Sequence, residues 1–346
     1  MNIIEYELPY HTVFHFICLK NCIRQILDYY GVKNSLFYLN CIPDITYEGQ
    51  FSSNGEYVVA YQSNLTPILP NYINRLKHFT YNESDNHKAW DDVLLRINNG
   101  YPIISMVDTY ELKYREKDYH KNHGSHAIIV HGYDPLYEEV KIIDWYEPFF
   151  FKGKISKEEY TRSRNSTNSY SNNPFSGHSL ENEWFYLSKH GWTEDSGKLL
   201  KESLKLYLSY NSYIPYKAEK ENTYVGVKAL KILFEKLSSV DSPSKNIVEA
   251  FYNNIYCEYK AKHLFLHYLK SYSEENNTNL LENVISILKE LCIKWDAVTT
   301  LLLKTMVTNS VSIFEKAKVR LNEIIKQEYH LLSAISEAYN CMLYDF

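Results

Sequence analysis

This 346-residue sequence lacks long apolar runs, a surplus of basic residues and a high density of cysteines. No stretch approaches the roughly 20 apolar residues that a membrane-spanning helix requires. Lysine and arginine number 37 against 42 aspartates and glutamates, a formal net charge of −5. No basic field is therefore present to attract nucleic acid or an anionic membrane surface. We expect a globular protein that binds neither.

The six cysteines are too few and too widely spread to form a dense disulfide framework. Residues 1–10 lack the basic start and the apolar run of a secretory signal peptide. The sequence therefore predicts a reduced, cytoplasmic protein. No glycine-rich loop that cradles phosphates is present, and we expect no bound cofactor.

Two patterns divide the chain, and together they predict an α+β fold. Residues 1–192 mix helical and strand patterns. They contain helices at Cys18–Tyr30 and Ala89–Asn98 and strands at Ile103–Val107, His126–Val130, Val140–Ile143 and Trp184–Leu187. Residues 163–178 are rich in serine and asparagine and indicate a mobile loop or lid. In residues 193–346 apolar residues recur at helical spacing, which predicts an all-α helical bundle.

Three side chains fall where a cysteine-dependent enzyme needs them. Cys18 begins a predicted helix, where the positive end of the helix dipole favours a thiolate over a thiol. His126 begins a strand, and Asp144 ends a second strand that pairs with the first as a hairpin. A nucleophile, a base and a carboxylate that orients the base form a Cys-His-Asp constellation.

Other residues near these three have simpler interpretations. Cys22 lies one helical turn after Cys18, and core packing is its expected role, although a nucleophilic or redox role stays open. His123, His126 and His131 are close in sequence. However, residues 126 and 131 alternate to opposite faces of a strand, and no nearby cysteine or carboxylate completes a zinc set. We expect no metal site.

Three stretches, in this order, carry a family resemblance. They are the Cys18 helix through Tyr30-Gly31; Gly100-Tyr-Pro102 with Asp108-x-x-x-Leu112-x-Tyr114; and His126–Asp134 with Ile143-Asp144. Together they cover about residues 10–150, and they resemble the N-terminal domain of the butirosin-biosynthesis protein H family. That family is itself similar to bacteriocin-processing cysteine peptidases.

The resemblance implies a papain-like domain used for acyl transfer, followed here by the helical bundle. In that family an acyl group moves from the phosphopantetheine thioester of a carrier protein onto an amine during antibiotic assembly. Carried onto this sequence, Cys18 is the nucleophile, His126 the base and Asp144 the orienting acid. Phosphopantetheine would arrive on the carrier as part of the substrate. The implied partners are an acyl or peptidyl carrier protein and an amine acceptor, and the long helices suggest a homodimer.

The sequence departs from the peptidase pattern before the nucleophile. A glutamine about six residues upstream usually helps to form the oxyanion hole, whereas Tyr10-His11-Thr12-Val13 stands here. His11, Thr12 or the Cys18 backbone N–H are the candidate replacements. Asp108 has two open interpretations: it supports the site or contacts a substrate amine, or it caps the turn after its strand.

Three functions are consistent with these residues. The first is an amide-forming cysteine acyltransferase of nonribosomal-type natural-product assembly. Because a thioester releases its thiol easily, an enzyme that acts on one can function with a weaker oxyanion hole. The second is a papain-like peptidase or amidase with the same residues. The third is a catalytically inactive module that binds a peptide or a carrier.

Overall fold

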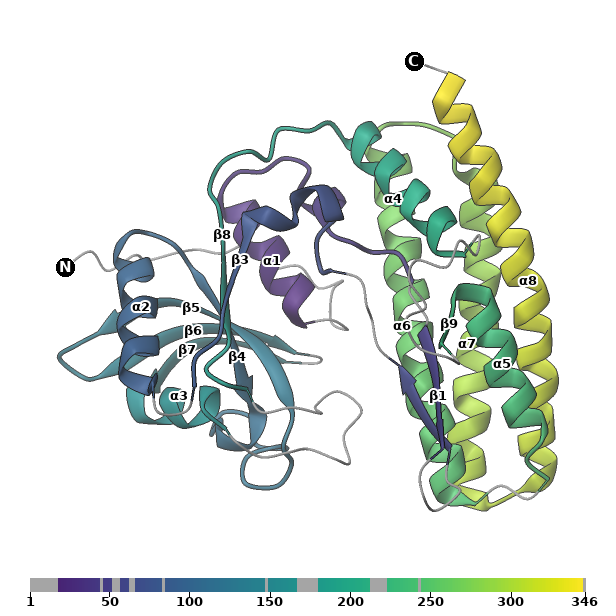
Figure 1. The fold of residues 1–346 in the computed structure, drawn as a ribbon, viewed down its shortest axis with the longest axis horizontal. Helices are drawn as coiled ribbons and strands as arrows, with labels where there is room; N and C mark the ends of the chain where they lie inside the picture. Colours follow the sequence, from purple (N-terminus) through teal and green to yellow (C-terminus); the bar gives the residue numbers. More distant parts are fainter. Residues whose placement is uncertain are drawn as a thin grey trace. The chain divides into compact units, whose positions relative to one another are not determined.

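The computed structural model describes residues 18–43, 46–51, 57–61, 66–82, 85–146, 149–166, 180–211, 223–241 and 244–344. The packing of its elements divides the chain into two compact units (Figure 1). The first unit comprises Met1–Leu39 and Pro67–Glu194, and the second comprises Asn40–Thr66 and Asp195–Phe346. An antiparallel sheet in the first unit and long helices in the second give an α+β fold, as predicted.

The first unit contains a six-stranded sheet with the order β3-β8-β4-β5-β6-β7, in which every neighbouring pair is antiparallel. Its strands are β3 (Leu76–Phe79), β4 (Ile103–Asp108), β5 (Ser125–Asp134), β6 (Glu139–Tyr146), β7 (Phe149–Ser156) and β8 (Trp184–Leu187). The four predicted strands are confirmed as β4, β5, β6 and β8, with β5 and β6 longer than expected. Consecutive residues of β4 and β5 are buried, because helices cover both faces of the sheet.

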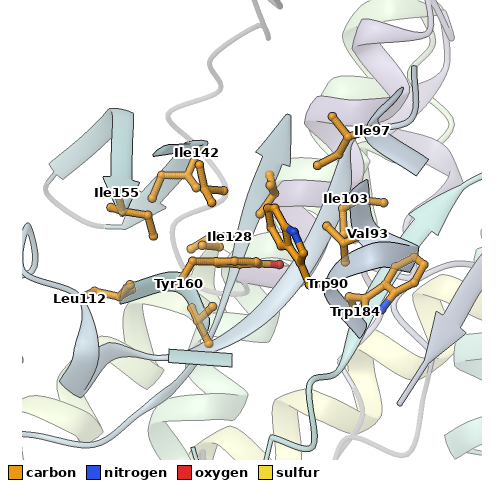
Figure 2. Close-up of a cluster of buried hydrophobic side chains, with 13 residues drawn as sticks. Trp90, Val93, Ile97, Ile103, Leu112, Ile128, Ile142, Ile155, Tyr160 and Trp184 are labelled. Atoms are coloured by element: carbon orange, nitrogen blue, oxygen red, sulfur yellow. The ribbon is translucent and has the colours of Figure 1, made fainter. Parts of the chain in front are cut away.

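A large apolar cluster joins the sheet to α2 (Asn86–Asn98) and α3 (Lys157–Arg164). Figure 2 shows its aromatic centre, where the ring of Trp90 on α2 lies 6.0 Å from the ring of Tyr160 on α3. The members are Trp90, Val93, Ile97, Ile103, Val107, Leu112, Ile128, Val130, Val140, Ile142, Ile155, Tyr160 and Trp184. This core fixes the central strands that carry the candidate site.

The helix α1 (Cys18–Tyr29) packs against β5 and ends one residue before the predicted end at Tyr30. Its buried face includes Ile23, Ile26 and Leu27. Gly31 has a φ of 74°, in the left-handed region that glycine adopts without strain. The Val32 N–H then donates to the carbonyl of Leu27, which closes the helix with a Schellman-type bond.

The structure corrects part of the predicted mobile loop at 163–178. Residues 163 and 164 are the last turn of α3, and both side chains are buried. Ser156 caps this helix by accepting from the Glu159 N–H at 3.1 Å, and Ser156-x-x-Glu159 has the form of a capping box. Residues 167–179 of the predicted loop lie outside the described residues.

The second unit is mainly helical, as predicted. Its helices are α4 (Ser196–Asn211), α5 (Gly226–Ser238), α6 (Lys245–Glu275), α7 (Glu282–Thr308) and α8 (Val311–Tyr344). Only Asn309 and Ser310 separate α7 from α8, and Asn309 adopts the left-handed conformation with a φ of 51°. Such a short connection between packed helices reverses the chain direction, as Figure 1 shows. Among the described residues, none of these helices has the length and apolar character needed to span a membrane.

A three-stranded antiparallel sheet in the second unit was not predicted. Its order is β2-β1-β9, with β1 at Thr46–Phe51, β2 at Tyr57–Tyr61 and β9 at Thr223–Val225. The first two strands precede most of the first unit in sequence, yet they belong to the second unit. The division at residues 194/195 lies two residues from the predicted boundary at 192/193.

A buried ion cluster connects α6 and α8. The Lys262 Nζ lies 2.6 Å from Glu328 Oε2 and 3.2 Å from Glu258 Oε1, and all three side chains are almost completely buried. Burial alone lowers the pKa of Lys262. The charges of Glu328, Tyr207 and Glu258 outweigh burial and raise this pKa above its usual value. The lysine is therefore charged inside the helical unit.

Candidate active site

The structure brings two of the three predicted residues into direct contact. His126 is in β5 and Asp144 is in β6, and these strands pair antiparallel. The Nε2 atom of His126 lies 2.6 Å from Oδ1 of Asp144. Because the carboxylate accepts, Nε2 carries the hydrogen. A further side-chain hydrogen bond joins His126 to Cys18.

Asp144 is completely buried and accepts three hydrogen bonds. Besides His126, the Tyr114 hydroxyl donates to Oδ2 at 2.9 Å, and Arg115 Nη1 donates to Oδ2 at 3.2 Å. Burial raises the pKa of this carboxyl, but His126, Arg115 and Tyr114 together lower it below its ordinary value. Asp144 is therefore an anion at neutral pH.

The buried anion changes the charge of His126. Burial lowers the pKa of the imidazole, whereas the charges of Asp144 and Cys18 raise it, and the pKa of His126 rises to about 9. The imidazole is therefore protonated at pH 7. The ordinary value for histidine is about 6.5.

Cys18 opens α1 and is partly exposed, so a reagent can reach it. Burial raises the pKa of its thiol. The charge of His126, a hydrogen bond with His126 and a backbone hydrogen bond from Ala127 act in the opposite direction, and the net pKa is lowered. A lowered thiol pKa beside an imidazolium favours the thiolate, which is the nucleophilic form of cysteine.

Cys22 has the opposite character. Its side chain is buried, and its thiol donates to the carbonyl of Ala127 at 3.5 Å. Burial, with the charges of Cys18 and Asp144, raises the pKa of Cys22 well above its usual value. The thiol is therefore protonated, which agrees with packing and not with nucleophilic attack.

Asp108 lies at the end of β4, and its side chain forms hydrogen bonds with residues at both ends of the 109–124 segment. Its buried carboxylate accepts from the N–H of Tyr110 at 3.0 Å and from the N–H of Gly124 at 3.2 Å. The Ser166 hydroxyl donates at 2.7 Å, and His123 Nδ1 lies at 2.8 Å. Asp108 therefore caps the turn and fixes the loop before His126, which is one of the two roles that the sequence allows.

His11 and Thr12, the two side chains predicted for the oxyanion hole, lie outside the described residues. The neighbouring histidines are engaged with carboxylates, His123 with Asp108 and His126 with Asp144. Within the described ranges, no three His, Cys, Asp or Glu side chains are placed to hold a metal ion.

Sequence reasoning missed the partners of Asp144. In the sequence, Tyr114 stands out only as part of the family motif, and no pattern marks Arg115. Both follow the short helix Thr109–Glu111, and they meet Asp144 only because the chain folds back over β6. No local pattern marks such a contact, so only the motif position of Tyr114 pointed toward it.

The comparison with protein families agrees with this geometry. Residues 18–145 match the model of the family described as "Butirosin biosynthesis protein H, N-terminal". The match begins at Cys18 and includes His126 and Asp144, and it confirms the predicted resemblance over this stretch. The family name places it in antibiotic biosynthesis and suggests a biosynthetic enzyme. A comparison with curated proteins found no match.

Proposed function

We propose that the protein is a cysteine acyltransferase that forms an amide from a carrier-protein thioester in antibiotic or related natural-product assembly. The observation that supports this function best is the buried Asp144–His126 pair beside the lowered pKa of Cys18. A helix that presents the cysteine to a strand bearing the histidine is also the arrangement of a papain-like domain. The partners of the proposed acyltransferase are an acyl or peptidyl carrier protein and an amine acceptor.

In the first half-reaction, the Cys18 thiolate attacks the thioester carbonyl. A bond forms between the cysteine sulfur and the acyl carbon, and the bond to the carrier sulfur breaks. The His126 imidazolium gives its proton to the departing carrier thiolate. The products are the acyl-enzyme and the free carrier thiol.

In the second half-reaction, an amine attacks the acyl carbon on Cys18. Neutral His126 accepts a proton from the attacking nitrogen, and the Cys18 thiolate leaves. The amide is released, and the thiolate and imidazolium are restored. Asp144 holds the imidazole in the required orientation in both halves.

An acyl adduct on Cys18 is the direct test. The protein is incubated with S-acyl-N-acetylcysteamine thioesters and with acyl-loaded carrier protein, digested, and analysed by mass spectrometry with and without added amine. We expect the acyl mass on the Cys18 peptide and its conversion to amide when the amine is added. Release of free acid while the amine is not consumed would indicate a hydrolase. No adduct, with Cys18 alkylated no faster than the other cysteines, would indicate a binding module.

The replacement Asp144→Asn is expected to make Cys18 less reactive at neutral pH. Without the carboxylate, burial lowers the pKa of His126, which loses its charge at pH 7 and no longer stabilises the thiolate. The rate of Cys18 alkylation by iodoacetamide should fall about ten-fold or more at pH 7, since one pKa unit is a factor of ten. The pH at which alkylation reaches half its maximum should move upward. An unchanged profile would contradict this electrostatic coupling.

A further inference from the structure

The two oxygens of Asp144 have separate partners. Oδ1 binds His126, whereas Oδ2 binds the hydroxyl of Tyr114 and the guanidinium of Arg115. A carboxylate held at one oxygen can still rotate about its Cβ–Cγ bond. Donors on the second oxygen prevent this rotation, and they keep Oδ1 directed at the imidazole.

Arg115 is itself fixed by a second carboxylate. Its Nε and Nη2 atoms donate to Oδ2 of Asp118 at 3.1 and 3.0 Å, while Nη1 reaches Asp144. Its side chain is only 11% exposed, so solvent screens these pairs weakly. The planar guanidinium directs Nε and Nη2 at one carboxylate and Nη1 at the other, a fixed geometry that the single ammonium group of a lysine does not reproduce.

Tyr114 is fixed by its ring. The ring stacks on Phe151 with centroids 4.0 Å apart and planes 7° apart, and Phe151 is the β7 residue paired with Asp144. The preceding Lys113 N–H donates to Oε1 of Glu159 at 2.9 Å. The hydroxyl therefore points at Asp144 from a rigid support.

We propose that Tyr114 and Arg115 are positioning residues that hold Asp144 against His126 and thereby maintain the Cys18 thiolate. This inference rests on the proposed function, because it assigns a role within the same site. Because Arg115 is held by Asp118, this role also makes the reactivity of Cys18 depend on an ordered 109–124 segment.

Charge alone would produce the opposite effect, and this difference makes the proposal testable. Arg115 is a cation, so its direct influence on His126 is to lower the pKa of the imidazole. Removing it would raise the pKa of His126 if charge alone mattered. Loss of positioning would instead lower that pKa, because Asp144 would turn away. Among the described residues, the other titratable groups that interact with this pair or with Arg115 are Cys18 and Cys22 on α1 and Tyr114 and Asp118 in the 109–124 segment.

The experiment measures the pKa of His126 by NMR in protein labelled at its histidine rings, with His126→Gln used to assign the signal. It compares the wild type with Arg115→Gln and Tyr114→Phe, and alkylation of Cys18 by iodoacetamide at pH 7 is the second readout. In Arg115→Gln we expect the pKa to fall by about one unit or more and alkylation to slow about ten-fold. In Tyr114→Phe, which keeps the ring, we expect the same direction and about a three-fold slower reaction.

Arg320→Gln is the matched control. This arginine on α8, in the second unit, is 54% exposed and pairs with Glu323 of the same helix. It should leave both readouts unchanged. If Arg115→Gln does not fold, Tyr114→Phe decides alone.

An unchanged or raised pKa of His126 in a folded variant overturns the positioning role. Neither readout requires an acyl donor, so the test remains valid even if no thioester acylates the protein. A wild type that forms acyl-Cys18, combined with variants that keep the pKa of His126, would refute positioning and leave the proposed function intact. A wild type with no acyl transfer, combined with the expected shifts, would refute the function alone.

Discussion

Acyl transfer is expected to fall by at least about 10³-fold in Cys18→Ala, because the acyl-enzyme cannot form without the sulfur. The adduct seen by mass spectrometry should disappear with the activity. The thiol sits at the start of a helix and is partly exposed, so its removal should disturb the fold little. Thermal unfolding measured by circular dichroism separates lost chemistry from lost structure.

Cys22→Ala is the matched control for this prediction. It removes a thiol one helical turn away on the same helix, and that thiol is buried with a raised pKa. We expect the adduct on Cys18 and most of the turnover to remain. Full turnover in Cys18→Ala, or loss of the adduct only in Cys22→Ala, would show that the nucleophile is misassigned.

The replacement Lys262→Met is expected to lower the free energy of unfolding by about 3–5 kcal/mol, the usual cost of removing one partner from a buried ion pair. It leaves the Glu258 and Glu328 carboxylates buried without their cation. Burying two like charges together is costly, so at least one must take up a proton. Urea unfolding followed by circular dichroism measures the loss.

Two further variants test the cause. Lys304→Met changes an exposed lysine on α7, and it should alter stability by no more than about 0.5 kcal/mol. Combining Lys262→Met with Glu258→Gln and Glu328→Leu removes the uncompensated charges, and most of the lost stability should return. A triple variant as unstable as the single one would show that packing of the lysine stem, not charge, is responsible.

Elements with a regular pattern and a clear end were predictable from the sequence. The apolar spacing of α1 together with Gly31 gave that helix to within one residue. The apolar spacing of α2 gave its end at Asn98 but placed its start at Ala89, three residues late. The hydroxyl of Ser244 accepts from the Ile247 N–H and caps α6, as serine commonly does at the start of a helix. Each of these features depends on residues only a few positions apart, so it can be predicted from the sequence alone.

Features built from distant contacts were not predictable. The strand β1 pairs with β9, whose residues lie 175 to 179 positions later, and neither strand has a marked apolar alternation. The contact of Arg115 with Asp144 joins a turn to a strand 29 residues later. Asp108 allowed two interpretations because the sequence could not show which donors would surround it. Cys18, His126 and Asp144 stood out because each lies at the end of a predicted element and because the family pattern has the same residues in this order.

The path of the chain between the units limits how the protein can be divided. The chain passes between them three times, after residues 39, 66 and 194. In the three-stranded sheet β1 is central, with β2 on one side and β9 on the other. A fragment ending at 194 would carry β1 without β9, leaving one edge of the strand unpaired and open to association with other chains. The first unit is thus encoded with a piece of the second unit inside it, and the gene has no single point at which the two could be separated or exchanged.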